Sequence, residues 1–139
     1  MGAVSRLRAA GSAAQLRPAA GGAPAARLGK AGERAAAAFL RKRGYEVVGA
    51  GFLARRGELD LVCVRRAELV VVEVKTRASD AFGTPFEAVT SKKRRSLLAA
   101  AAEYRALSEW RGPIRFAVIG LAVRPDGGFD VELIEDPFA

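Results

Sequence analysis

The sequence predicts an α/β domain in which two helices flank a β-sheet, with the element order α-β-β-β-α-β-β. The chain has 139 residues, the size of one domain, and half of its residues are hydrophobic, which suffices for a buried core. Two segments have helical start and stop signals, and five others alternate apolar and polar residues or form short apolar runs. Each element follows from local signals of this kind.

The two helices are identified by their ends. One is expected over residues 33–43, because basic residues fill its last turn and Gly44 follows as a C-terminal cap. The other is expected over residues 91–109, with Thr90 or Ser91 as its N-cap. Its candidate buried positions are Leu97, Leu98, Ala101 and Tyr104.

Five strands are expected between turn residues. They are predicted over residues 45–53, 58–65, 69–76, 114–123 and 129–134. The strands at 58–65 and 69–76 carry apolar residues on both faces, so we expect them at the centre of the sheet, covered on both sides. Cys63 is then a small buried hydrophobic residue.

The first 28 residues differ from the rest of the chain. They are rich in alanine and glycine and contain no acidic residue, and they show no periodic apolar face. We expect residues 1–28 to form a disordered arm and residues 29–139 to form the domain. Much of the net charge of +8 comes from the first 30 residues, so the domain itself is only mildly basic. No apolar run reaches the ~18 residues of a membrane span, so no membrane partner is expected.

The composition also excludes several kinds of site. The chain has no histidine and a single cysteine, which excludes Ser-His-Asp and Cys-His triads, His-ligated zinc and an intrachain disulfide. A lone cysteine suits a reducing compartment, and we expect the protein in the cytoplasm.

Charged residues interrupt the two central strands at one end. A hairpin turn centred after Arg66 places Asp60 opposite Glu73 and Glu58 opposite Lys75, with all four side chains on one face. Buried charges cost several kcal/mol each unless they are paired or bind a metal. Facing carboxylates repel, a divalent cation relieves the repulsion, and oxygen ligands alone favour Mg²⁺ or Mn²⁺. A buried Asp–Lys–Glu ion-pair cluster explains the hairpin equally well.

The same residues carry a resemblance to a known family. Residues 57–61 (GELDL) and 72–77 (VEVKTR) resemble the split PD-(D/E)xK signature of restriction-endonuclease-like proteins. The match is closer still to the small bacterial YraN family, similar in fold to archaeal Holliday junction resolvases. The resemblance covers residues 29–138. Its further motifs are GERAA at 32–36, GY at 44–45, FGTP at 82–85, EAVT at 87–90 and IEDPF at 134–138. Together these ordered motifs are far more specific than ExK alone.

The resemblance implies a restriction-endonuclease-like fold with a mixed central sheet flanked by helices. It also implies an endonuclease that depends on Mg²⁺ or Mn²⁺ and hydrolyses DNA. Branched DNA is among the expected substrates, and a homodimer is the form that would cut both strands of a junction. The first alternative is a non-catalytic nucleic-acid-binding protein that retains the fold. The second is an interaction protein whose charged cluster is structural.

The resemblance assigns roles residue by residue. The implied metal ligands are Asp60, Glu73, the backbone carbonyl of Val74 and Glu33 from the first helix. Lys75 is the implied catalytic lysine, which positions water or stabilises charge on the phosphate. Glu58 belongs to the site or pairs with Lys75, and we favour the pairing. The residues expected near the scissile phosphate are Thr76, Arg77 and the 82–85 loop.

Two departures from the family pattern concern the same site. Many members have an acidic residue on the fourth strand of the core, where this chain has Ala117. Related resolvases often have a glutamine on the second helix, where this chain has the basic run Lys92, Lys93, Arg94 and Arg95. Positive charge at a helix N-terminus opposes the helix dipole. We expect this run to bind DNA phosphates, and a solvated surface turn is the alternative.

Overall fold

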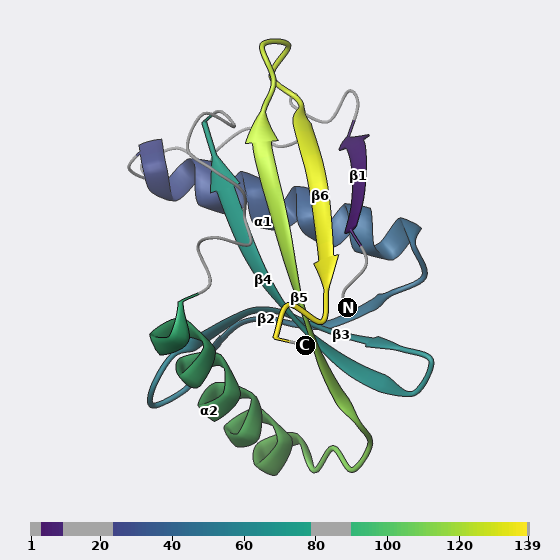
Figure 1. The fold of residues 1–139 in the computed structure, drawn as a ribbon, viewed down its shortest axis with the longest axis vertical. Helices are drawn as coiled ribbons and strands as arrows, with labels where there is room; N and C mark the ends of the chain where they lie inside the picture. Colours follow the sequence, from purple (N-terminus) through teal and green to yellow (C-terminus); the bar gives the residue numbers. More distant parts are fainter. Residues whose placement is uncertain (1–3, 10–23, 79–89, 139) are drawn as a thin grey trace.

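The computed structural model describes residues 4–9, 24–78 and 90–138, with side chains described from residue 27 onward. The described chain forms a six-stranded sheet in the order β1-β6-β5-β4-β3-β2, with two helices (Figure 1). The strands are β1 (Val4–Ala9), β2 (Glu46–Leu53), β3 (Glu58–Arg65), β4 (Glu68–Arg77), β5 (Ile114–Val123) and β6 (Phe129–Glu135). The helices are α1 (Pro24–Lys42) and α2 (Ser91–Ser108).

The sheet is mixed, as expected. Strands β4 and β5 pair in parallel, joined by the crossover that contains α2, and every other neighbouring pair is antiparallel. The order α1-β2-β3-β4-α2-β5-β6 is the one that the sequence predicts for a nuclease-like core. The parallel pair β4 and β5 lies at the centre of the sheet and is buried on both faces. The crossover helix α2 covers one face, and α1 covers the other.

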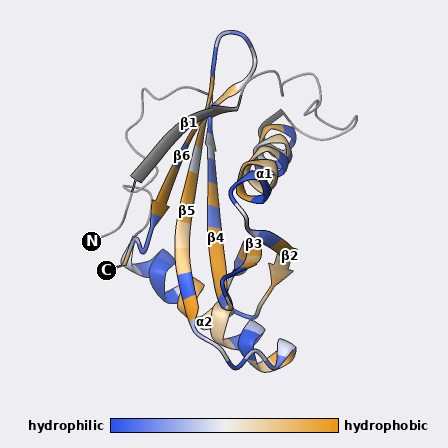
Figure 2. Cartoon of the chain, turned by 90° about the vertical axis from the view of Figure 1, so that its right-hand side faces the viewer, coloured by the Kyte–Doolittle hydropathy of each residue, from blue (hydrophilic) through white to orange (hydrophobic). Residues whose placement is uncertain are grey.

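The two helices cover opposite faces of the sheet (Figure 2). Alternate residues of β4 explain this arrangement, since Val70 and Val72 pack with α1 while Leu69 and Val71 pack with Leu97 of α2. Cys63 is fully buried in the α1 layer, as predicted. Neither described helix is long and apolar enough to cross a membrane.

The start of the chain differs from the expectation. Residues 4–9 form β1, which pairs antiparallel with β6, and α1 begins at Pro24 rather than near residue 32. The prediction of a disordered arm is therefore wrong for residues 4–9 and 24–28, while residues 1–3 and 10–23 lie outside the described chain. Proline is well tolerated in the first helical turn, and Leu28 packs against the α1-side core. Strand β1 pairs with the edge of β6 through backbone hydrogen bonds. The side-chain pattern of the sequence does not predict such a pairing, because the backbone alone makes it.

Helix α2 follows its predicted ends closely. The Thr90 hydroxyl accepts a hydrogen bond from the Lys93 backbone N–H at 3.1 Å, and Glu109 closes the helix in the left-handed region. Leu97 and Ala101 are buried as predicted, but Leu98 is 44% exposed. Alanines form much of the contact between α2 and the sheet, so the buried stripe is too narrow to include Leu98.

Candidate functional site

The β3–β4 hairpin has the predicted register. Arg66 and Ala67 both adopt positive φ, at 52° and 62°, as a tight two-residue hairpin turn requires. The paired positions run from Arg65 opposite Glu68 to Leu61 opposite Val72. Continued by one pair, this register sets Asp60 opposite Glu73, and the hydrogen bond between their side chains agrees with it.

Buried Glu73 and half-buried Asp60 form a carboxyl pair on the α2 face of the sheet. Asp60 Oδ2 accepts a hydrogen bond of 2.8 Å from the backbone N–H of Val74. Burial, followed by the hydrogen bond and negative charge of Glu73, raises the pKa of Asp60 to about 7, although the Val74 hydrogen bond and the charge of Lys93 act in the opposite direction. Asp60 therefore keeps its proton up to near neutral pH.

Lys93 places a cation beside this pair. Its Nζ lies 3.2 Å from Glu73 Oε2, and the two side chains are 34% and 5% exposed respectively. Glu73 Oε2 is buried and has no aligned hydrogen-bond partner among the described residues, so the contact is an ion pair rather than a well-directed hydrogen bond. The sequence places Lys93 in a basic run, but only the packing of α2 against the sheet brings it to Glu73.

Glu33 lies near the pair without joining it. The tight contact of Gly32 with Thr76 holds α1 beside the end of β4. Burial, then the charges of Asp60 and Glu58, raises the pKa of Glu33. Within residues 24–78 and 90–138 no three acidic or cysteine side chains gather closely enough to form a metal-binding group. Glu33 thus contributes to the electrostatic field of the site from the neighbouring helix.

The remaining residues of the VEVKTR segment do not share one face. Lys75 is half-buried and, by strand alternation, lies on the same face as Glu73. Thr76 points to the opposite face, where it meets Gly32. Glu58 is exposed and makes no ion pair with Lys75 in the described part of the chain, so the pairing that we favoured is absent. Arg77 is half-buried, and the 82–85 loop lies outside the described residues.

The four basic residues at the start of α2 have different surroundings. Lys93 turns to Glu73, and the Arg94 guanidinium lies 5.2 Å from the centre of the Phe138 ring. Lys92 and Arg95 are exposed. Arg94 is exposed as well, but its guanidinium stacks on Phe138, so Lys92 and Arg95 have the surroundings most typical of a solvated phosphate contact.

Ala117 lies on the face opposite to the carboxyl pair. It is buried in the α1-side core and pairs with Val72 of β4 and Glu135 of β6. An acidic side chain at this position would therefore point away from Asp60 and Glu73. The departure from the family pattern leaves the donor set of the pair unchanged.

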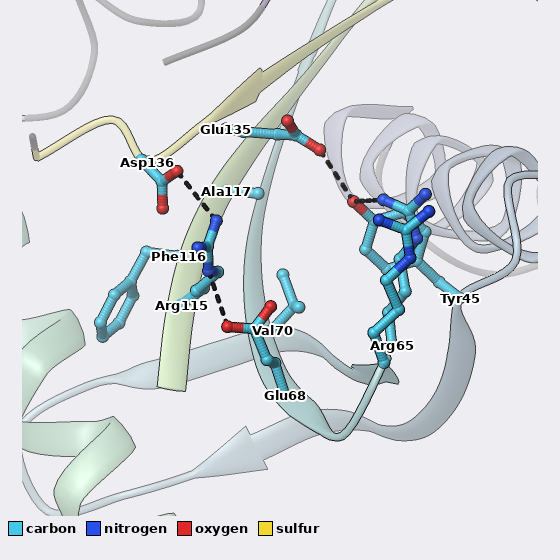
Figure 3. Close-up of a pocket in the computed structure, with 10 residues that line it drawn as sticks. Tyr45, Arg65, Glu68, Val70, Arg115, Phe116, Ala117, Glu135 and Asp136 are labelled. Carbon is cyan, nitrogen blue, oxygen red and sulfur yellow. Dashed lines mark hydrogen bonds and ion pairs between the residues drawn. The ribbon is translucent and has the colours of Figure 1, made fainter. Parts of the chain in front are cut away.

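A cavity of about 240 Å³ lies elsewhere, where β4 and β5 begin (Figure 3). Arg115 donates hydrogen bonds to Glu68 and Asp136 at 2.9 and 3.3 Å. Tyr45 donates to Glu135 at 3.1 Å, and the Arg65 guanidinium lies 4.9 Å from the centre of the Tyr45 ring. Arg115 is thus neutralised by Glu68 and Asp136 within the lining, while Tyr45 contacts both Glu135 and Arg65. The sequence did not suggest this cavity, because its residues come from four separate segments.

Comparison with known proteins places the chain in a family. The model of a family described as "Uncharacterised protein family UPF0102" matches residues 32–121. The chain belongs to UPF0102. This is the YraN family whose motifs the sequence resembles, and the match extends from the start of the GERAA motif on α1 into β5.

Relatives of the same family cover most of the chain. The UPF0102 protein STH1475 of Symbiobacterium thermophilum is 43% identical over 113 residues, which is 81% of this chain and 96% of the relative. UPF0102 proteins of Parabacteroides distasonis and Syntrophomonas wolfei are 40% and 43% identical over 80% of this chain, covering 91% and 96% of their own lengths. The similarity therefore spans nearly the whole length of these relatives.

Proposed function

We propose that this UPF0102 protein is a Mg²⁺- or Mn²⁺-dependent endonuclease that hydrolyses phosphodiester bonds in DNA, with branched DNA among its substrates. The observation that carries the proposal is the pair of half-buried Asp60 and buried Glu73, which lies on the same face as Lys75 and contacts Lys93 at the start of α2. Stability alone does not favour two facing carboxyl groups in the middle of a sheet, because each loses hydration and they repel.

The donor set fits a hard divalent cation. Carboxylate and backbone carbonyl oxygens are the ligands that Mg²⁺ and Mn²⁺ prefer. Burial, followed by the hydrogen bond and charge of Glu73, raises the pKa of Asp60. Glu73 Oε2 is buried without an aligned hydrogen-bond donor in the described chain. Asp60, Glu73 and the Val74 carbonyl would hold the ion, with Glu33 adding negative charge from α1.

The chemistry divides between the ion and the chain. A bound divalent ion supplies Lewis-acid stabilisation of the phosphate and a nucleophilic water of lowered pKa. The Val74 N–H orients the Asp60 carboxylate. The Lys75 ammonium lies on the same face, where it can position the attacking water or stabilise charge on a phosphate oxygen. Lys92 and Arg95 are exposed on α2 and are suited to contact the flanking DNA backbone.

The test combines metal binding with cleavage. Melting temperatures of the wild type and Asp60→Asn are measured with and without Mg²⁺ or Mn²⁺, and linear, flapped and four-way DNA substrates are assayed in parallel. We expect metal to raise the melting temperature of the wild type only, because binding to the native state stabilises it. Lys75→Ala should still respond to metal but should cleave about 10²- to 10³-fold more slowly, the usual loss for one electrostatic catalytic group.

A non-catalytic nucleic-acid-binding role is the second candidate, and one observation favours it. Lys93 already places a positive charge on Glu73, so a folded site without metal has a counter-ion. This role predicts DNA binding that persists in a chelator, no cleavage of any substrate and no melting shift with metal. If DNA binding is also absent and Asp60→Asn is strongly destabilised, the charged cluster is structural.

A further inference from the structure

We infer that Lys93 is a displaceable internal cation of the site: it neutralises Glu73 when no metal is bound, releases Glu73 to the metal, and then contacts a DNA phosphate. This inference rests on the proposed function and adds a residue to it. It assigns Lys93 a role different from that of Lys92 and Arg95, its neighbours on α2.

The geometry places the ammonium in competition with a metal ion. Lys93 Nζ lies 3.2 Å from Glu73 Oε2, a buried oxygen with no aligned donor among the described residues. The charge of Lys93 is also felt at Asp60. A divalent ion held by the same oxygens would meet the ammonium at close range, and like charges at that distance repel strongly in a partly buried site. The ion pair and the metal complex therefore exclude one another.

The position of Lys93 on its helix supports a functional role. It lies in the first turn of α2, which contains no acidic residue, and its backbone N–H is already used by the Thr90 cap. A positive side chain in this turn opposes the helix dipole. Local helix stability thus gives no reason for a lysine here, whereas the contact with Glu73 does.

The released side chain has a second partner available. Lys93 is 34% exposed, so its flexible stem can swing from Glu73 toward solvent without unpacking the core. At the start of α2 the ammonium adds to the positive end of the helix, and together they favour a phosphate oxygen. Metal binding and DNA binding should then strengthen one another, because the metal frees a phosphate ligand.

One experiment tests the ion pair in the unaltered protein. Lysine acetylation is followed by fragment mass spectrometry with and without saturating Mn²⁺, saturation being judged from the melting temperature. We expect Lys93 to become several-fold more reactive when metal is present, while Lys92 on the same turn stays unchanged. Equal reactivity of Lys93 in both states would overturn the inference, and this readout does not depend on the folding of any variant.

A calorimetric Mn²⁺ titration of Lys93→Gln, Lys93→Arg and Lys92→Gln separates the inference from the proposed function. Lys93→Gln should bind Mn²⁺ about tenfold more tightly than the wild type, while the other two variants should stay near the wild-type affinity. In the presence of Mn²⁺, Lys93→Gln should bind DNA less tightly than the wild type.

The remaining outcomes are distinct. Equal Mn²⁺ affinity in the wild type and Lys93→Gln overturns this inference and leaves the metal-dependent nuclease standing. Binding in Lys93→Gln but not in the wild type supports Lys93 as the occupying cation and removes the proposed metal dependence. No Mn²⁺ binding by either protein overturns both.

Discussion

Gly32 of α1 lies against the side chain of Thr76 of β4 so closely that a Cβ atom at position 32 would overlap the threonine hydroxyl. The contact joins the helix that carries Glu33 to the strand that carries Glu73 and Lys75. Gly32→Ala should therefore destabilise the protein by about 1–3 kcal/mol, the usual cost of overpacking, and should move Glu33 relative to the carboxyl pair. Urea denaturation measures the loss.

The matched control lies on the same helix. A Cβ at Gly29 would meet no atom within 4 Å, so Gly29→Ala should stabilise the protein by about 0.5–1 kcal/mol through helix propensity. Equal effects of the two substitutions would show that the Gly32–Thr76 contact is not the constraint on α1.

The raised pKa of Asp60 predicts a specific pH dependence of stability. The native protein holds this proton up to about pH 7, whereas the unfolded chain releases it near the ordinary value of 3.8. Unfolding then releases a proton between these values, so the free energy of unfolding falls as the pH rises from about 4 to 7, by on the order of 2–4 kcal/mol. Chemical denaturation across this range measures the slope.

Asp60→Asn should remove much of that slope. The amide oxygen can still accept the hydrogen bond from Val74 N–H, and the amide NH₂ can donate to Glu73, so no charge is stranded. The variant should be more stable than the wild type at pH 8. The exposed carboxylate of Glu46 provides a control, since Glu46→Gln should keep the wild-type profile. A variant at position 60 that is less stable at pH 8 would contradict the repulsion between the two carboxyl groups.

The basic residues of α2 should differ in their contribution to DNA affinity. Lys92→Gln and Arg95→Gln should each flatten the dependence of log affinity on log salt by up to ~0.9 for duplex DNA, as expected for one lost phosphate contact. Titrations at several salt concentrations give the slope. Lys42→Gln, at the exposed end of α1, should leave it unchanged. If it flattens the slope as much, the basic start of α2 is not the DNA surface.

The pairing of β1 with β6 predicts a local effect of truncation. Removal of residues 1–9 should leave the domain folded, because the described core is built from residues after position 27. It should expose the edge of β6, so hydrogen exchange at its backbone amides should become faster. Unchanged protection along β6 would contradict the pairing, while loss of the folded state would assign β1 a larger role in stability.

Local rules made much of the fold predictable. Strand alternation placed Asp60, Glu73 and Lys75 on one face, because side chains alternate strictly along a strand. The two-residue turn after Arg65 set the hairpin register, since the length of a tight turn fixes which residues of the two strands pair. Thr90 marked the start of α2 by supplying the acceptor that the helix needs.

The tertiary structure decided the contacts between distant segments. The ion pair of Lys93 with Glu73 depends on how α2 crosses the sheet after the crossover, and four neighbouring basic residues gave no reason to single out one of them. The nearness of Glu33 to the pair depends on the Gly32–Thr76 contact, and the pairing of β1 depends on a free edge of β6. Local sequence determines periodicity, caps and turns because these arise from neighbouring residues. The packing of whole helix and sheet surfaces decides which helix end contacts which strand. The charged site depends on that packing, because its residues come from different elements.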